Sequence, residues 1–237
     1  MNLPINGIIK ATRHWLHKNN NDEDVITQLL NVIKTSMQQN YFQFNDTFYQ
    51  PEKGIAMGSP ISGTMAEIYL QYVEANYIKQ WWETDEIIYY KRYVDDILII
   101  YNNQKINKDR MEKEINKIDK NLEFKMTPES NNIIHYLDLT LQRRSNNIEL
   151  SIYRKPTNTD ITIQYKSNHP FEHKISAFRY YIHRMTTLPI IEKSRVEEWN
   201  TIVTTAINNG YPKQMIYNLK KKQTNRMTHK ETQEREK

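Results

Sequence analysis

The sequence predicts an α+β fold in which an antiparallel sheet with packed helices is followed by a smaller helical region. Segment 89–101, Tyr-Tyr-Lys-Arg-Tyr-Val-Asp-Asp-Ile-Leu-Ile-Ile-Tyr, places two acids within a run of β-branched and aromatic residues, which is typical of a hairpin. Segments on both sides of it carry apolar residues at helical spacing. Beyond residue 153, polar turns and helical stretches replace the strand-like pattern.

The first part of the chain alternates helical and strand-like patterns. An N-cap at Asp22 or Asp24 precedes a helical stripe of Val25, Ile26, Leu29, Ile33 and Met37. Segment 41–49 alternates aromatic and polar residues, which predicts a strand or hairpin. Ser59 and Pro60 indicate an N-cap and a first-turn proline for a second helix, whose stripe is Ile61, Met65, Ile68, Tyr69, Tyr72 and Val73.

The chain beyond the acidic hairpin continues with shorter elements and then with helices. We expect a helix with Met111, Ile115, Ile118 and Leu122 on its apolar face, then a strand over 123–127 that ends at Pro128. Segments 133–141 and 148–153 should pair through a turn at 145–147. Helices are expected over 171–187, 192–208 and 212–222. The resulting domain division is 1–153, a helical region 154–222, and a basic disordered tail 223–237.

Composition and charge narrow the classes of function. The 237 residues carry a net charge of +5, with a pI near 9.1, which suits an anionic partner. The excess of Lys and Arg lies in segment 213–237. The chain has no cysteine, which excludes disulfides and thiolate metal sites. We expect an intracellular protein of the nucleus or cytoplasm with no membrane partner, because neither a secretory signal nor a membrane-length apolar run is present.

Asp95 and Asp96 are the first candidate site. Two adjacent carboxylates repel each other, and a divalent cation is the usual way to keep both ionised. This pattern predicts a metal site for phosphoryl chemistry. The alternative is an ordinary Asp-rich hairpin turn.

The segment Gly54-Ile-Ala-Met-Gly-Ser-Pro60 is the second candidate site. A glycine-bearing loop that leads into a helix N-terminus lets backbone N–H groups approach a phosphate or a base closely. The alternative is a strand-to-helix turn with good capping.

Taken together, the Gly54 to Ser62 loop and Tyr93-Val94-Asp95-Asp96 resemble the motifs of reverse transcriptases. Segments 135–141, 152–160 and 167–170, together with Lys174, resemble the palm-to-thumb region of Penelope-like retroelements. The resemblance covers about residues 1–187. It implies an incomplete right-hand polymerase palm with an antiparallel sheet over 1–153 and a small helical thumb after it.

The resemblance also implies a chemistry and residue roles. RNA-templated DNA synthesis from dNTPs would use an RNA template, a DNA primer and two Mg²⁺ ions, with Mn²⁺ as a possible substitute. Asp95 would be the principal metal ligand and catalytic residue, with Asp96 assisting, and Tyr93 would lie at the primer end. The other expected contacts are Gly54, Met57, Gly58, Ser59 and Pro60 for template base and nucleotide, and Arg154, Lys155 and Lys174 for the nucleic-acid backbone.

One departure from the family pattern concerns the metal site. The family places a third carboxylate on an earlier strand with a Phe-X-X-Asp-like pattern, and we find none before Tyr41. The expectation is therefore a chain that lacks that strand and the fingers, with little or no activity of its own. The alternative functions are a catalytically inactive remnant that only binds nucleic acid and a globular domain with coincidental motifs.

Overall fold

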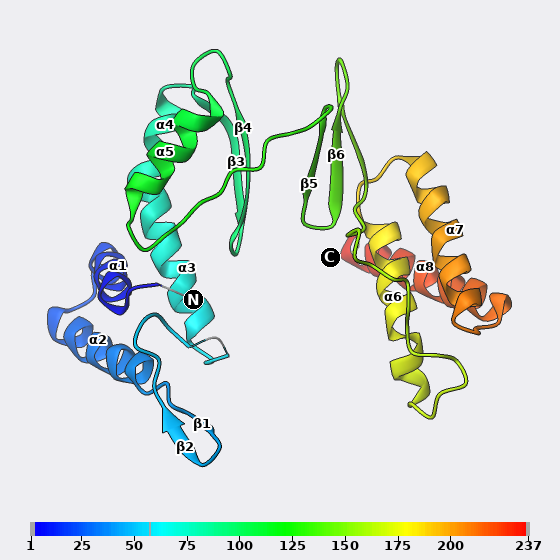
Figure 1. Ribbon diagram of the computed structural model, residues 1–237, viewed down its shortest axis with the longest axis horizontal. Coiled ribbons are helices and arrows are strands. Elements are labelled where there is room, and N and C mark those ends of the chain that lie inside the picture. The colour runs from blue at the N-terminus through cyan, green and yellow to red at the C-terminus, as the bar shows by residue number, and fades with distance from the viewer. Residues whose placement is uncertain (1–2, 57, 236–237) are drawn as a thin grey trace. The chain divides into compact units, whose positions relative to one another are not determined.

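The computed structural model describes residues 3–56 and 58–235 and divides into two compact units, Met1–Thr127 and Pro128–Lys237. Figure 1 shows the helices and strands of the two units. The division precedes the expected boundary at residue 153. The reason is that the strands of 133–152 belong with the C-terminal helices: Ile152 packs on their core, and the Ile191 N–H donates to the Leu150 carbonyl at 3.1 Å.

Three helices form the first core of unit 1. They are α1 (Ile5–Lys18), α2 (Glu23–Gln38) and α3 (Ser62–Val73), and their buried residues include Ile8, Met37 and Tyr69. The Asp22 carboxylate accepts the Asp24 N–H at 2.9 Å, which confirms an N-cap at the start of α2. Its buried face, Ile26, Leu30 and Met37, differs from the expected stripe, because Val25 and Leu29 are exposed. Helix α1 was not predicted.

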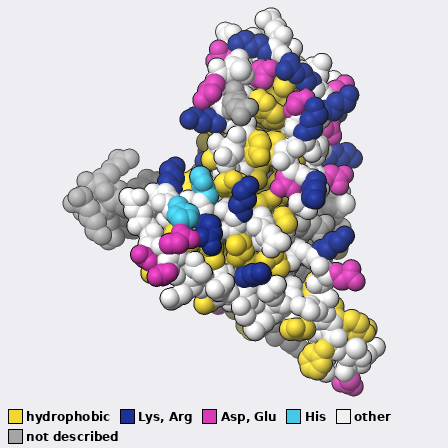
Figure 2. Space-filling model, turned by 90° about the vertical axis from the view of Figure 1, so that its left-hand side faces the viewer, with side chains coloured by type: hydrophobic (Ala, Val, Ile, Leu, Met, Phe, Trp, Pro, Cys, Tyr) yellow, Lys and Arg dark blue, Asp and Glu magenta, His cyan; other side chains and the backbone are white. Residues whose placement is uncertain are grey.

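A short hairpin follows α2 and confirms the alternation over 41–49. Strands β1 (Phe42–Phe44) and β2 (Thr47–Tyr49) pair across Asn45 and Asp46, whose φ values of 46° and 57° suit a type I′ turn. Its aromatic side chains are exposed, and Phe48 retains 72% of its accessible surface. Hydrophobic side chains gather at the lower end of unit 1 in Figure 2, where Figure 1 places this hairpin.

The remaining elements of unit 1 form a second core. The π-helical turn η1 (Glu74–Ile78) and helix α4 (Lys79–Glu83) continue α3, and strands β3 (Ile87–Tyr93) and β4 (Asp96–Tyr101) follow. Helix α5 (Lys108–Ile118) is capped by Asn107, whose side chain accepts the Arg110 N–H at 2.8 Å. The buried residues of this core are Ile78, Ile87, Ile106 and Met111.

The predicted strand over 123–127 is wrong, because the segment pairs with no other strand. Side chains of α5 satisfy its backbone instead. The Asn116 amide donates to the Phe124 carbonyl at 2.8 Å, and its oxygen accepts the Phe124 N–H at 2.7 Å. Bonds to a helix side chain therefore replace a strand ladder.

Unit 2 begins with a three-stranded antiparallel sheet of β5 (Ile133–Tyr136), β6 (Leu139–Arg143) and β7 (Ile148–Ile152). The predicted single strand over 133–141 is thus divided. A turn at Leu137 and Asp138, with Leu137 at a φ of 52°, separates β5 from β6. Tyr136 pairs with Leu139 across this turn. The alternation of Leu137, Leu139 and Leu141 suggested one strand, but the turn between β5 and β6 lies within it.

Three helices complete unit 2. Helices α6 (Phe171–Thr187) and α7 (Glu192–Asn208) confirm the predicted ranges. Helix α8 (Lys213–Arg235) continues past residue 222, where the last helix was expected to end. Their core contains Phe178, Ile182, Ile202 and Ile216.

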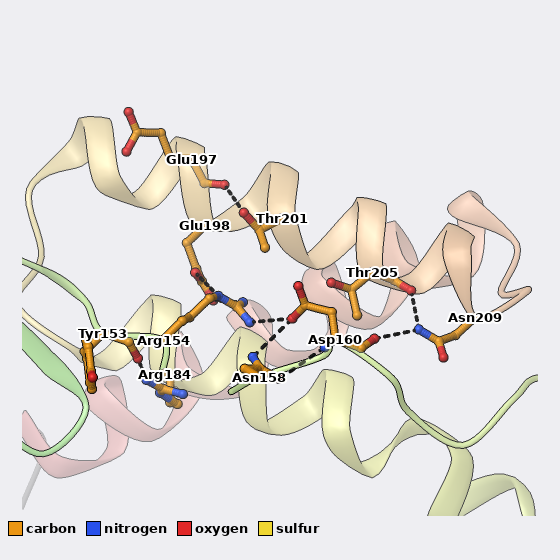
Figure 3. A network of polar contacts seen from close by, with 10 residues as sticks. All are labelled: Tyr153, Arg154, Asn158, Asp160, Arg184, Glu197, Glu198, Thr201, Thr205 and Asn209. Atoms are coloured by element: carbon orange, nitrogen blue, oxygen red, sulfur yellow. Dashed lines mark hydrogen bonds and ion pairs between the residues drawn. The ribbon is translucent and has the colours of Figure 1, made fainter. Parts of the chain in front are cut away.

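The side chain of Asn209, which is 3% exposed, connects the segment before α6 to the end of α7 through hydrogen bonds (Figure 3). Its side-chain oxygen accepts the Thr162 N–H at 3.0 Å, and its amide donates to the carbonyls of Asp160 and Thr205 at 2.9 and 2.7 Å.

Helices and antiparallel sheets together confirm the α+β class. The described residues contain three separate sheets, of two, two and three strands, in place of one continuous sheet. Within this part of the chain, no helix has the length and apolar character needed for a membrane crossing.

Candidate active site

The paired acids lie at the tip of the β3–β4 hairpin, as the sequence predicted. Tyr93 and Asp96 form the last cross-strand pair, which leaves Val94 and Asp95 as a two-residue turn. Val94 has a φ of 55°, a conformation that suits the first central position of a type II′ turn and that glycine usually occupies. The side chains of Asp95 and Asp96 are both exposed. The acidic turn, defined as residues 93–96, therefore presents its carboxylates to solvent.

Arg92 lies directly beneath the acidic turn. Its side chain is only 7% exposed and forms ion pairs with Glu67 of α3 and Glu74 of η1. The hydrogen bonds to Arg92 lower the pKa of Glu67 to about 2, and those to both acids raise the pKa of Arg92. The guanidinium therefore stays charged beside the ionised carboxylate of Glu67.

A cavity of about 1240 Å³ adjoins the acidic turn within unit 1. One wall is formed by Arg92, Val94 and Asp95, and another by the loop 50–54 that follows β2. Further lining comes from Glu67 and Glu74 and from the segment 120–124. The charged residues that line the cavity are five acids, Glu52, Glu67, Glu74, Asp95 and Glu123, and three cations, Lys53, Arg92 and Lys120. The excess of negative charge favours a cation.

Of the described residues expected in the glycine loop, only Gly54 lines the cavity. Gly54 lines the same cavity as Asp95 and has a φ of 80°, and Gly58 has a φ of 98°. Gly58, Ser59 and Pro60 are not among the residues that line the cavity, and neither are Tyr93 and Asp96. Met57 lies outside the described residues.

The start of α3 corrects the expected capping. The helix begins at Ser62, with Ile61 as its N-cap residue and no side-chain cap bond. Ser59 contributes its carbonyl, which accepts the Ser62 N–H at 3.2 Å. A turn thus separates Ser59-Pro60 from the helix, because the Ser59 backbone takes part in the turn that precedes α3.

The acidic turn supplies only oxygen ligands, and these suit Mg²⁺ or Mn²⁺. One or two carboxylates are the protein ligands that Mg²⁺ commonly takes when substrate phosphates complete its shell. Among the residues that the structure describes, no group of three or more His, Cys, Asp or Glu could hold a metal ion. Asp95 and Asp96 supply two carboxylates of the type that these ions bind.

The three cations expected to contact the nucleic-acid backbone differ in the contacts they make within unit 2. Arg154 pairs with Glu198 at 2.6 Å and with Asp160 at 3.1 Å, so its charge is compensated within unit 2 (Figure 3). Lys174 donates to the Tyr165 carbonyl at 2.9 Å. Lys155 is exposed, has no ion pair among the described side chains and lines a pocket of about 270 Å³ with Arg184.

Sequence reasoning missed Arg92, Glu67 and Glu74. A signal was available, because Glu67 and Glu74 are seven residues apart and therefore lie on one face of a helix. The arginine that meets them lies on a strand, and sequence periodicity does not link a strand to a helix.

Two family models match the chain. One, described as reverse transcriptase (RNA-dependent DNA polymerase), matches residues 9–141, which is more than half of the chain and includes the acidic turn and the glycine loop. The other, described as animal helix-turn-helix domain, matches residues 161–221, which span α6, α7 and the first part of α8. No curated protein and no solved structure matches.

Proposed function

Because the chain belongs to the reverse transcriptase (RNA-dependent DNA polymerase) family, we propose that unit 1 is the palm of a Penelope-like reverse transcriptase that extends a DNA primer on an RNA template. The observation that carries the proposal is the shared cavity, which has Asp95 on one wall and Gly54 on another. The Penelope-like subtype rests on the motifs of segments 135–141, 152–160 and 167–170.

The acidic turn and the cavity beside it have distinct roles in the proposed reaction. Asp95, with Asp96 beside it, would bind the metal ions. When bound, Mg²⁺ supplies activation of the primer 3′-hydroxyl and charge neutralisation of the triphosphate. The backbone at Gly54 would lie against the template base or the nucleotide, because a glycine permits close approach. Tyr93, the last residue of β3, would contact the primer end.

For unit 2 we propose nucleic-acid binding, in agreement with both the expected thumb and the helix-turn-helix similarity. Helix α8 carries Lys213, Lys220, Lys221, Lys222 and Arg226, none of which forms an ion pair with a described residue. Lys220 lies 4.2 Å from the Trp199 ring centroid, and Lys213 lies 5.6 Å from that of Tyr217. Uncompensated cations beside aromatic rings suit contacts to phosphates and bases.

Primer extension by the whole chain tests the polymerase assignment. The assay supplies an RNA template with a DNA primer, dNTPs and Mg²⁺ or Mn²⁺. If the chain is an active polymerase, Asp95→Ala should lower incorporation by about 100-fold or more, since removal of a positioned group commonly costs that much. Asp109→Ala changes another exposed aspartate of unit 1 and should leave the rate unchanged. Binding of the primer–template without incorporation would favour the inactive, binding-only alternative.

A further inference from the structure

The hydrogen bonding of Arg92 is saturated by groups that surround the acidic turn. A guanidinium has five N–H bonds. Nε donates to Glu74 at 2.6 Å, Nη1 to Glu67 at 2.8 Å, and Nη2 to Glu67 and Glu74 at 2.9 and 3.2 Å. The fifth bond runs from Nη1 to the carbonyl of Val94 at 3.1 Å. Every donor of this buried side chain is thus used.

The partners of Arg92 come from separate elements. Glu67 belongs to α3 and Glu74 begins η1, so the two acids lie on one helix face, two turns apart. Tyr90 of β3 also donates to Glu74, at 2.8 Å, and Gln71 donates to Glu67, at 2.9 Å. Each carboxylate therefore has a hydrogen-bond partner in addition to the arginine.

The bond to Val94 connects this network to the acidic turn. Val94 occupies a left-handed backbone conformation that β-branched residues rarely adopt, and its carbonyl accepts a charge-assisted bond from Arg92. Because Asp95 follows Val94 directly, the orientation of the Val94 peptide sets where the Asp95 backbone begins.

We propose that Arg92 is a positioning residue that fixes the geometry of the acidic turn, with Glu67 and Glu74 as its supports. The charge of the guanidinium is compensated by those two acids, so it stabilises the turn without neutralising Asp95 and Asp96. The role of the turn as a metal site rests on the proposed function, whereas the geometry of the turn does not.

The bonding pattern requires the planar fork of arginine, because one amine cannot reach two carboxylates and a carbonyl in the same geometry. Arg92→Lys retains the charge and removes the fork. Arg110→Lys is the matched control, because Arg110 is an exposed arginine of the same unit that pairs with Glu86 at 3.4 Å.

Two measurements on the whole chain test the proposal, after circular dichroism has confirmed that each variant is folded. The first is Mn²⁺ binding followed by electron paramagnetic resonance. We expect Arg92→Lys to weaken it about 10- to 100-fold, the usual effect of removing a group that orients a metal ligand. The second is amide hydrogen exchange, which should accelerate at least tenfold over residues 93–97 in Arg92→Lys and remain unchanged over α5. Arg110→Lys should match the parent in both.

The outcomes separate the two proposals. If the parent binds Mn²⁺ and Arg92→Lys binds it equally well, the positioning role is overturned while the polymerase assignment stands. If the parent binds no Mn²⁺, a metal site in the substrate-free chain is overturned, and hydrogen exchange alone decides the geometry. Unchanged exchange over residues 93–97 in Arg92→Lys then overturns the positioning role, and accelerated exchange supports it.

Discussion

At the scale of one residue, Val94 has an unfavourable backbone conformation and a hydrogen bond that holds it in place. A left-handed conformation costs an L-residue about 1–2 kcal/mol, and a β-branched side chain is least suited to it. The φ of 55° at Val94 is accompanied by the hydrogen bond from Arg92 to its carbonyl. A residue that is locally unfavourable therefore occupies the turn that carries the two carboxylates.

Replacement of Val94 by glycine should release this strain. We expect Val94→Gly to raise the free energy of unfolding by about 1 kcal/mol, because the relief exceeds the entropy that glycine adds to the unfolded chain. Urea unfolding measures the change. Asn45→Gly is the control, because Asn tolerates positive φ and the substitution should shift stability by less than about 0.5 kcal/mol. A lower urea midpoint for Val94→Gly would show that the valine side chain stabilises the turn.

At the scale of elements, the segment after α5 shows how a helix side chain can take the place of a neighbouring strand. The composition of 123–127 suits a strand, but Asn116 of α5 bonds both the N–H and the carbonyl of Phe124. The Met126 N–H donates to Glu112 of the same helix, at 3.4 Å. The segment is thereby bonded to α5 and contributes Phe124 to the cavity.

Loss of the Asn116 amide should release this segment. Asn116→Ala leaves two half-buried backbone groups of Phe124 without their partner, and we expect a loss of about 1–3 kcal/mol in the free energy of unfolding. Hydrogen exchange should accelerate over 122–127. Lys117→Ala, at the next and more exposed position of α5, provides the comparison. Equal exchange in the two variants would show that other contacts keep the segment in place.

At the scale of the whole molecule, the excess of positive charge lies on an ordered element. The net charge is +5, and the basic residues of 213–226 lie on α8, which packs through Ile216 on the core of unit 2. A helix holds its cations at fixed spacing. The number of its contacts to phosphates can therefore be measured from the salt dependence of binding.

The affinity of the chain for nucleic acid should accordingly fall with salt. In fluorescence anisotropy on a labelled duplex, Lys220→Gln with Lys221→Gln should weaken binding and reduce the slope of log K against log salt by about 1 for each lost phosphate contact. Lys193→Gln is the comparison, because it removes one positive charge, as each of the two α8 substitutions does. The Lys193 amine lies 4.0 Å from the Glu197 carboxylate on α7, so its loss should have a smaller effect on binding. An unchanged slope in the α8 double variant would locate the contacts elsewhere.

The sequence by itself determined the elements whose signals are local. The cap at Asp22, the bounds of α6 and α7 and the hairpin around Asp95 follow from periodicity and capping within a few residues. Only the tertiary structure decided the start of α3, the division at Leu137 and the partners of Arg92, which lie 25 and 18 residues away in the chain. Contacts across such separations depend on how helices and strands pack together, and periodicity within one element carries no information on that packing.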